Sequence, residues 1–377
     1  MTKKSILCVV GARPNFMKIA PIMKALRAGP EPITAKIVHT GQHYDEAMNK
    51  SFFADLGIPQ PDINLEVGSG SHAVQTAEVM RRFEPVLDQE QPAAILVVGD
   101  VNSTISCALV AAKKNIAVIH VEAGLRSYDR AMPEEINRVL TDQISDLLYT
   151  TERSALANLT REGIDPKRVH FVGNVMIDTL YHNLQQAVPA AETMRDSGID
   201  LSHGYALLTL HRPSNVDHAE CLRGLLETIN IVSERLPVVF PLHPRTKSRI
   251  AQFGLDGLLA KGRYFLLPPV GYLHMLGLMR EAKIVLTDSG GIQEETTALG
   301  VPCLTLRHNT ERPITVEEGT NLIVGQSRPD ILAATQEILA TGGKAGRIPE
   351  YWDGHAAERI AAHLRAWLKN LPDAEAA

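Results

Sequence analysis

The sequence has no long hydrophobic run, and this absence argues against a chain that spans a membrane. Apolar residues make up 45% of the 377 residues, yet no stretch approaches the roughly 18 consecutive apolar residues that a spanning helix needs. The first apolar segment, Ser5 to Val10, is short and no cleavage site follows it. We therefore interpret it as a first strand and not as a secretory signal.

Cysteine is scarce, and its spacing argues against zinc-binding and redox pairs. The four cysteines, Cys8, Cys107, Cys221 and Cys303, stand far apart in apolar surroundings, and no Cys-x-x-Cys motif occurs. We expect reduced thiols in the core, which is typical of a cytoplasmic protein. No group of residues has the spacing of metal ligands, so we expect no metal site.

Runs of like charge are absent as well, which argues against a partner with a phosphate backbone. The formal net charge is -5 at pH 7, and five like charges never follow one another. Proteins that bind nucleic acid carry clustered Lys and Arg side chains that neutralise phosphates. We therefore expect a small nucleotide ligand, and neither nucleic acid nor a membrane as a partner.

What the chain does contain is a regular alternation of short apolar runs and helical stretches. Its 377 residues exceed one typical core, so we expect two domains. Alternation of this kind indicates parallel sheets flanked by helices. The first set of runs is 6–10, 36–40, 95–98, 118–121, 147–150 and 170–172, and the second set is 207–210, 238–242, 265–267, 284–287, 304–306 and 322–324. We predict an α/β fold with two Rossmann-like domains and a cleft between them.

The domain boundary is expected near residue 173, because Gly173 and Asn174 follow the last run of the first set. Near the end of the chain, His355–Leu371 carries its apolar residues on one helical face. This pattern predicts an amphipathic helix that must dock on one of the domains.

Polar residues that follow the runs of the first half are candidates for a site, because ligands of open parallel sheets bind at the carboxyl ends of strands. Arg13 and Lys18 come at the first strand-to-helix turn and suit an anionic ligand, although an exposed helix start is an equal alternative. The turn is not Gly-x-Gly-x-x-Gly, which argues against a dinucleotide cofactor.

Carboxylates follow two further runs of this half. Asp100 and Glu122 come directly after apolar strands, where a charge is costly unless it is paired or solvated. Asp100 alternatively caps the next helix. Glu134 and Arg138 share a face of the following helix, with Ile136 turned inward, and an ordinary surface ion pair is the alternative there. Clustered acids are what proton transfer to and from carbon requires.

The second half ends its strands in residues that suit a nucleotide diphosphate. His211 follows the first strand of this half and His243 the second, and either ring alternatively has a purely structural role. The segment Asp288–Glu295 offers backbone N–H groups at Ser289, Gly290 and Gly291 just before a helix, a geometry that binds phosphates, although a tight turn alone is the alternative. Glu295 can accept hydrogen bonds from ribose hydroxyls, and Arg312 can balance the remaining charge.

Taken together in order, these motifs resemble the non-hydrolysing UDP-N-acetylglucosamine 2-epimerases. The resemblance spans almost the whole chain and is specific as a set. It is carried by Gly-Ala-Arg-Pro at 11–14, Thr-Gly-Gln-His at 40–43, Gly-Asp at 99–100, His-Val-Glu-Ala-Gly-Leu-Arg at 120–126, Pro-Glu-Glu at 133–135, Asp-Ser-Gly-Gly-Ile-Gln-Glu-Glu at 288–295 and Thr-Glu-Arg-Pro at 310–313.

The resemblance implies a GT-B-like pair of domains, a homodimer, and neither a metal nor a nicotinamide cofactor. It implies that the C-terminal helix packs back on the first domain, so that residues 1–172 with 355–377 form one domain and 173–354 the other. The residues that match the family's catalytic acids are Asp100, Glu122 and Glu134. Those that match its ligand-binding positions are Arg13, Lys18, Arg138, His211, Ser289, Gly290, Gly291, Glu295 and Arg312. We place His211 with the catalytic group.

The chain departs from the family pattern at three places. Some members have Gln-His-Arg-Glu in an activator site where this chain has Gln42-His43-Tyr44-Asp45. Asn15 replaces an acid that is common after Arg-Pro, and His211–Asn215 differs from the usual His-Arg-Arg-Glu.

The expected reaction is epimerisation of UDP-N-acetylglucosamine to its manno epimer, which supplies surface polysaccharide synthesis. Departure of UDP from carbon 1 acidifies the hydrogen on carbon 2, a carboxylate removes it, and re-protonation of the resulting glycal from the other face inverts the centre. Three alternatives remain: an epimerase of a UDP-diacetamido sugar, a GT-B glycosyltransferase, and a sugar-nucleotide sensor without catalysis.

Overall fold

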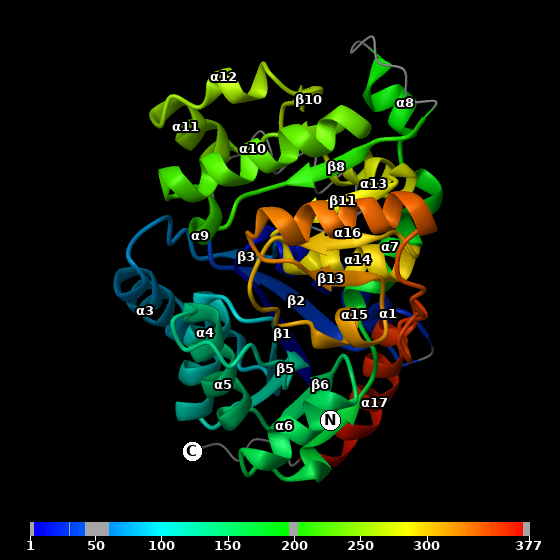
Figure 1. Cartoon of the computed structure of the whole chain (residues 1–377). Helices are drawn as coiled ribbons and strands as arrows, with labels where there is room; N and C mark the ends of the chain where they lie inside the picture. Colours follow the sequence, from blue (N-terminus) through cyan, green and yellow to red (C-terminus); the bar gives the residue numbers. More distant parts are fainter. Residues whose placement is uncertain (1–3, 30, 42–59, 196–202, 372–377) are drawn as a thin grey trace. The chain divides into compact units, whose positions relative to one another are not determined.

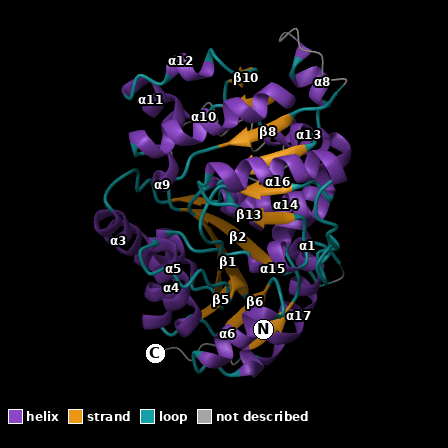
Figure 2. Cartoon of the chain, in the orientation of Figure 1, coloured by secondary structure: helices purple, strands orange, loops and turns teal. Residues whose placement is uncertain are grey.

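The computed structural model describes residues 4–29, 31–41, 60–195 and 203–371 of the chain (Figure 1). The chain divides into two compact units, which we call unit 1 (residues 1–182 and 350–377) and unit 2 (residues 183–349). Each unit contains one parallel sheet with flanking helices (Figure 2). The predicted α/β class with two parallel sheets is therefore confirmed.

Unit 1 is built on a parallel sheet with the strand order β3-β2-β1-β4-β5-β6-β7. Every expected strand of this half overlaps an observed one. The short strand β3 was not expected, because its two residues at the sheet edge carry too little pattern to be recognised. The bounds are β1 Ser5–Val10, β2 Thr34–His39, β3 Ile63–Asn64, β4 Ala94–Val98, β5 Ala117–Ala123, β6 Leu147–Thr150 and β7 Val169–Phe171.

Helices cover both faces of this sheet, which explains why its central strands are almost continuously apolar and buried. The helices are α1 Arg13–Arg27, α3 His72–Glu90, α4 Asn102–Lys113, α5 Pro133–Ile144, α6 Ser154–Arg161, α7 Val175–Asn183 and α17 Ala356–Asn370, with a short 3-10 turn, η1, at Pro166–Arg168. The predicted amphipathic C-terminal helix is α17. It packs against α1, which confirms that it returns to the first half of the chain.

Unit 2 repeats the design with the strand order β10-β9-β8-β11-β12-β13. All of its expected strands are observed, at β8 Ala206–Thr209, β9 Val238–Pro241, β10 Tyr264–Leu267, β11 Ile284–Thr287, β12 Cys303–Thr305 and β13 Asn321–Ile323. Its helices are η2 Leu184–Gln186, α8 Ala190–Thr193, α9 Pro213–Val216, α10 Ala219–Arg235, α11 Pro244–Gln252, α12 Asp256–Leu259, α13 Tyr272–Glu281, α14 Gly290–Leu299, α15 Pro313–Glu317 and α16 Arg328–Thr341. Leu208, Phe240 and Leu286 from three strands form its core with Ile229 of α10.

Helix α7 belongs to unit 1, although the sequence places a boundary before it near residue 173. The hydroxyl of Thr179 donates to the carbonyl of Met17, 2.5 Å away. The carboxylate of Asp178 accepts hydrogen bonds from the backbone N–H groups of Ala356 (3.1 Å) and Ala357 (2.7 Å) at the start of α17. These contacts fasten α7 to two elements of unit 1, and the chain passes into unit 2 only after residue 182.

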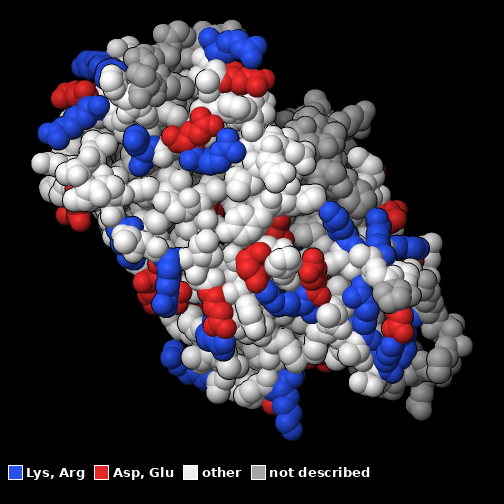
Figure 3. All heavy atoms as spheres, turned by 90° about the vertical axis from the view of Figure 1, so that its right-hand side faces the viewer, with Lys and Arg blue, Asp and Glu red and all other residues white. Residues whose placement is uncertain are grey.

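Three further features concern the thiols, the surface charge and the hydropathy of the helices. All four cysteines are free thiols, and burial raises the pKa of Cys8 to about 12. On the face drawn in Figure 3, Lys and Arg side chains are interspersed with Asp and Glu. Within the ranges that the structure describes, none of the helices has the length and hydropathy to cross a membrane.

The Asp178 contact predicts a measurable loss of stability in unit 1. Asp178→Ala leaves two backbone N–H groups of α17 without their acceptor, which should lower the free energy of unfolding by about 1–2 kcal/mol, the usual cost of losing a helix cap. Both tryptophans, Trp352 and Trp367, lie in unit 1, so urea denaturation followed by their fluorescence reports on this unit. Glu358→Ala, at an exposed position of the same helix, is the control, and equal midpoints for the two variants would contradict the assignment.

Candidate functional site

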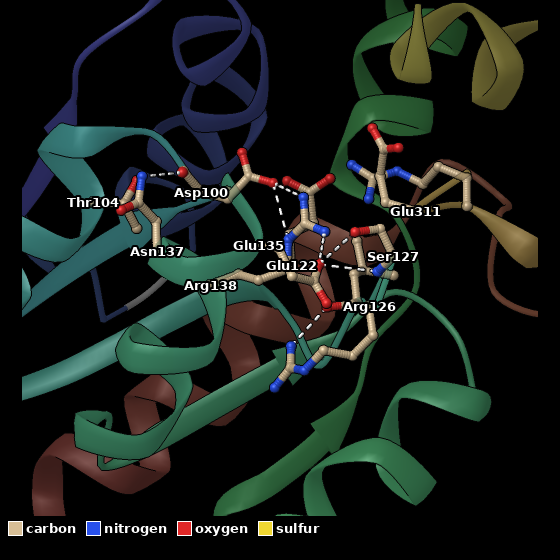
Figure 4. A network of polar contacts seen from close by, with 12 residues as sticks. Asp100, Thr104, Glu122, Arg126, Ser127, Glu135, Asn137, Arg138 and Glu311 are labelled. Carbon is tan, nitrogen blue, oxygen red and sulfur yellow. Dashed lines mark hydrogen bonds and ion pairs between the residues drawn. The ribbon is translucent and has the colours of Figure 1, made fainter. Parts of the chain in front are cut away.

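The carboxyl ends of neighbouring strands in unit 1 carry an acidic cluster, shown in Figure 4. Asp100 follows β4, and its carboxylate pairs with the guanidinium of Arg138 from α5, whose Nε donates over 3.2 Å. The N-cap residue of α4 is Val101 and not Asp100. Asp100 is therefore a partly exposed acid held by a buried arginine.

Glu122 occupies an unusual backbone position at the end of β5. The pairing between β5 and β6 shifts register between Val121 and Ala123, which marks a bulge, and Glu122 has a φ of 75°. A non-glycine residue at positive φ is strained and is found chiefly at functional sites. Its buried carboxylate forms an ion pair with the ammonium group of Lys18 from α1. The bulge thus turns Glu122 toward the strand ends and pairs it with a predicted ligand-binding residue.

The acid that pairs with Arg138 on α5 is Glu135, although the four-residue spacing of Glu134 and Arg138 favoured Glu134. Arg138 pairs with Glu135 at 2.6 Å, not with Glu134. The carboxylate of Glu134 is half-buried, and no polar partner for it is found among the described residues. Ile136 was expected to face inward, but it is 40% exposed, because α5 turns the face with Glu135 and Arg138 toward the protein.

Glu135 is a member of the acidic cluster that the sequence did not single out. Its carboxylate accepts hydrogen bonds from the backbone N–H groups of Ser127 and Tyr128 and from the Ser127 hydroxyl, each at 2.9 Å. It thereby fixes the loop after β5 and positions Arg138 at the same time. The signal that could have found it is its i,i+3 spacing to Arg138, which matches the helical repeat as well as the spacing of Glu134 does.

The turn from β1 into α1 separates the two predicted cations. Arg13 is the exposed first residue of α1, whereas Lys18 is buried against Glu122. Asn15 closes the turn: its side-chain oxygen accepts from Gly11 (3.2 Å) and Ala12 (2.9 Å), and its nitrogen donates to the carbonyl of Val98 (3.0 Å). The residue that replaces an acid in the family pattern therefore ties β1 to β4.

In unit 2, Asp288 organises the strand ends of β8 and β11. Its carboxylate accepts from Nδ1 of His211 (2.9 Å), from the backbone N–H groups of His211 and Arg212, and from the Asn215 side chain (3.2 Å). Burial pushes the pKa of Asp288 upward, but the hydrogen bonds from His211 and the backbone outweigh it and the pKa is lowered. Because a carboxylate holds Nδ1, the ring of His211 is oriented to present Nε2 to a ligand.

His243 has the structural role that the sequence left open. It is the N-cap of α11, and its Nδ1 accepts from the backbone N–H of Arg245 at 3.2 Å. Burial and the nearby ring of His211, whose centroid is 5.6 Å away, lower the pKa of His243. A neutral imidazole suits the role of a cap acceptor.

The loop between β11 and α14 presents an uncapped helix start. Ser289 is the N-cap of α14, yet its side chain forms no capping hydrogen bond, and Gly290 and Gly291 begin the helix. The N–H groups of a first helical turn lack partners within the helix, and the helix dipole favours an anion there. Unit 2 thus has an uncapped helix start at the segment where the sequence predicts a phosphate site, and phosphate binding there stays a prediction.

A buried cluster of three arginines and two glutamates lies beside this helix start. Glu311 pairs with Arg307 at 2.8 Å and with Arg212 at 3.5 Å, and Arg312 pairs with Glu294 at 2.8 Å. Burial opposes ionisation of Glu311, but Arg307, Arg312 and Arg212 outweigh it and hold the pKa of this carboxyl well below its usual range. Arg312, which was expected to balance charge, is therefore one member of a larger network. The sequence analysis did not single out its other members Glu311 and Arg307.

Glu295 lies one turn into α14 and is buried. The hydroxyl of Tyr272 donates to it over 2.8 Å. Burial raises the pKa of Glu295 to about 7, aided by repulsion from Glu294 and opposed by the bond from Tyr272. Close to neutral pH this carboxyl can both donate and accept hydrogen bonds, which suits contact with a diol.

Two further points concern what the site holds. Over the described ranges, no three His, Cys, Asp or Glu side chains come together in a way that could hold a metal ion. Residues Gln42 to Asp45, where the chain departs from the family pattern, lie outside the part of the chain that the structure describes.

Comparison with known proteins gives consistent matches over the chain. The profile of the family described as UDP-N-acetylglucosamine 2-epimerase matches residues 24–365. The UDP-N-acetylglucosamine 2-epimerase of Methanocaldococcus jannaschii is 44% identical over 361 residues, 94% of this chain and 97% of the relative. The UDP-2,3-diacetamido-2,3-dideoxy-D-glucuronate 2-epimerase of Pseudomonas aeruginosa is 40% identical over 363 residues, 95% of this chain and 99% of the relative.

Solved structures agree. The crystal structure of the M. jannaschii epimerase in complex with UDP-GlcNAc and UDP has a TM-score of 0.88 at 42% identity and covers 96% of this chain and 99% of that one. The Neisseria meningitidis epimerase bound to UDP-GlcNAc has a TM-score of 0.84 at 30% identity and covers 97% and 100% of the two chains. These matches confirm the GT-B-like fold.

The packing at the start of α14 predicts that a methyl group at Gly290 weakens binding of a nucleoside diphosphate. A Cβ atom there would lie 2.6 Å from Oε1 of Glu311, a buried atom held by arginines. Relieving such overpacking costs about 1–3 kcal/mol, so Gly290→Ala should weaken UDP binding by roughly tenfold or more, measured by isothermal titration calorimetry. Gly257→Ala is the matched control, because nothing lies within 4 Å of its added Cβ. Unchanged affinity in Gly290→Ala would contradict a ligand site at this helix start.

Proposed function

The chain belongs to the family of UDP-N-acetylglucosamine 2-epimerases, and we propose that it interconverts UDP-GlcNAc and UDP-ManNAc. The observation that carries this proposal is the acidic cluster of unit 1. Asp100 and Glu122 stand at neighbouring strand ends, and each faces a fixed cation, Arg138 or Lys18. A pure nucleotide binder has no need for carboxylates held in this way, whereas proton transfer at carbon does.

The chemistry explains why these groups are required. The hydrogen on carbon 2 of the sugar is not next to a carbonyl, so its direct removal near neutral pH faces a very high barrier. Departure of UDP from carbon 1 generates positive charge on the ring and acidifies that hydrogen. A carboxylate then removes the proton, leaving UDP and a 2-acetamidoglucal. Protonation of the glycal at carbon 2 from the opposite face, with return of UDP to carbon 1, completes the inversion.

We assign the binding of UDP to unit 2. The N–H groups of Gly290 and Gly291 would stabilise the diphosphate as negative charge develops on it, whereas the N–H of Ser289 already donates to Oγ1 of Thr287 over 3.0 Å. His211, which Asp288 orients, would donate to the leaving group, and Glu295 would bind the ribose hydroxyls. Arg13 and Arg312 complete the set of cations proposed to act on the ligand.

We assign proton transfer to unit 1. Inversion needs a proton acceptor and a proton donor on opposite faces of the sugar, and Asp100, Glu122 and Glu134 supply them. A facing cation favours the ionised form of a carboxylate. Asp100 and Glu122, which both have such a cation, are therefore the better candidates for the base.

A diacetamido UDP-sugar is the second candidate substrate, because the P. aeruginosa relative named for such a substrate is nearly as similar as the M. jannaschii one. We further propose that the protein acts as a cytoplasmic homodimer whose product supplies surface polysaccharide synthesis. The two Rossmann-like domains, which the sequence places at 1–172 with 355–377 and at 173–354, would carry the acids and the UDP site respectively, with α7 counted in the first of them as the structure has it.

Deuterium exchange tests the proposed reaction directly. Incubation with UDP-GlcNAc in deuterated water, followed by NMR, should show deuterium at carbon 2 and the manno epimer, because the glycal takes its new proton from solvent. UDP-2,3-diacetamido-glucuronate in parallel reveals which sugar is turned over faster. Neither exchange nor a new epimer with either sugar would overturn the proposal.

Neutralising the acids should remove activity and leave ligand binding in place. Asp100→Asn, Glu122→Gln and Glu134→Gln should each lower kcat by roughly 10²–10⁴-fold, the usual contribution of a general acid or base. UDP affinity should stay near that of the unmodified protein, since we assign UDP binding to unit 2. Glu358→Gln, at an exposed position on α17, serves as the control. Full activity in all three acid variants would favour a role without catalysis by these carboxylates.

A further inference from the structure

Behind the acidic cluster lies a buried ion pair that the proposed reaction does not use. His120 of β5 and Asp142 of α5 are both 0% exposed, and Nδ1 of His120 lies 2.6 Å from Oδ1 of Asp142. Asp142 also pairs with Arg126 at 2.7 Å, and Arg126 continues to Glu162 at 2.5 Å. Burying several charged groups costs free energy because they lose contact with water. The groups that they contact therefore indicate their role.

The pair binds the backbone of two glycines, one just before Asp100 and one shortly after Glu122 in the sequence. Nε2 of His120 donates to the carbonyl of Gly99, 2.9 Å away, and Gly99 immediately precedes Asp100. Oδ2 of Asp142 accepts from the backbone N–H of Gly124 over 3.1 Å, just after the bulge that carries Glu122. One buried pair therefore fixes the backbone just before Asp100 and just after Glu122.

Gly99 is the point where small displacements would matter most. Its N–H donates to the carbonyl of Val121 at 3.2 Å, so β5 binds this residue through both of its backbone polar groups. Gly99 also lies against the site, because a Cβ atom there would be 3.3 Å from Oε2 of Glu122 and 3.6 Å from Nζ of Lys18. A shift of Gly99 would therefore move Asp100 and disturb the Lys18–Glu122 pair together.

The hydrogen-bond pattern also fixes the orientation of the His120 ring. The Gly99 carbonyl can only accept, so Nε2 of His120 is the donor in that contact. Nδ1 lies 2.6 Å from Oδ1 of Asp142, whose other oxygen accepts from the Gly124 N–H and pairs with Arg126. Both ring nitrogens of His120 therefore have a fixed partner.

We propose that His120 and Asp142 are positioning residues of the epimerase, which hold Asp100 and Glu122 at the geometry that proton transfer requires. The proposal rests on the proposed function of the same acids. Reacting groups displaced by about 1 Å can lose roughly 100-fold in rate. Loss of the pair should accordingly lower kcat and leave KM for the UDP-sugar nearly unchanged. General unfolding would instead lower the amount of active protein.

The decisive comparison is between two substitutions of one residue. His120→Gln retains a side-chain N–H that can reach the Gly99 carbonyl, whereas His120→Phe fills the space and donates nothing. We expect His120→Phe to lose roughly 100-fold in kcat, with KM within about threefold, and His120→Gln to recover at least a tenth of the lost rate. Glu162→Gln is the control, because it alters only the outer end of the Arg126 contact. Circular dichroism and active-site titration with UDP give the folded fraction to which each rate is normalised.

The pair can also be observed without any turnover. In a ¹⁵N NMR spectrum of the labelled unmodified protein, Nε2 of His120 should show the shift of a protonated, hydrogen-bonded ring nitrogen, and Asp142→Asn should change the shift of Nδ1. Absence of epimerase activity in the unmodified protein would overturn the proposed function. An active unmodified protein in which His120→Phe keeps its kcat, or in which Nε2 of His120 carries no proton, would overturn the positioning role.

Discussion

The need to pair every charge at the buried carboxyl ends of strands governs the rest of this structure. In unit 1 the ion pair between Lys18 and Glu122 joins the first helix to the fifth strand, across a separation of more than one hundred residues in the sequence. Without Lys18, the buried carboxylate of Glu122 would lose its ion-pair partner at a strained backbone position, and both the lost pairing and the strain cost stability. The strain persists only because the ion pair and the surrounding backbone hydrogen bonds fix it.

Unit 2 meets the same constraint with a different residue. Asp288 lies at the end of β11, and its partners are all on the turn after β8: the ring and backbone of His211, the backbone of Arg212 and the side chain of Asn215. Both units thus place a carboxylate after a central strand and pair it with groups from another element. The two carboxylates differ in exposure. Asp288 is buried and accepts several hydrogen bonds, whereas the side chain of Asp100 is partly exposed. The exposed acid is the one available for chemistry.

The sequence predicted the parts of the structure that depend on local pattern. Strand positions followed from apolar runs, and the helix start at Ser289 to Gly291 followed from the glycines. What it could not resolve was which of two adjacent acids takes a partner: Glu134 and Glu135 both lie at helical spacing from Arg138, and only the tertiary position of Ser127 selects Glu135. Glu311 was missed for the same reason, because its arginine partner Arg212 is supplied by a distant loop of unit 2.

His120 shows how one motif can combine a reacting group with its support. Within His120-Val121-Glu122, the first and third residues would share one face of a regular strand. The bulge at Glu122 breaks that alternation, so the imidazole ring of His120 stays in the core while the carboxylate turns to Lys18. A bulge costs backbone hydrogen bonds and strain, and both must be compensated nearby. Asp142, which binds His120 on one side of the bulge and Gly124 on the other, is placed where that compensation is needed. The position of the Glu122 carboxylate and the buried His120–Asp142 pair are therefore two consequences of one irregularity in β5.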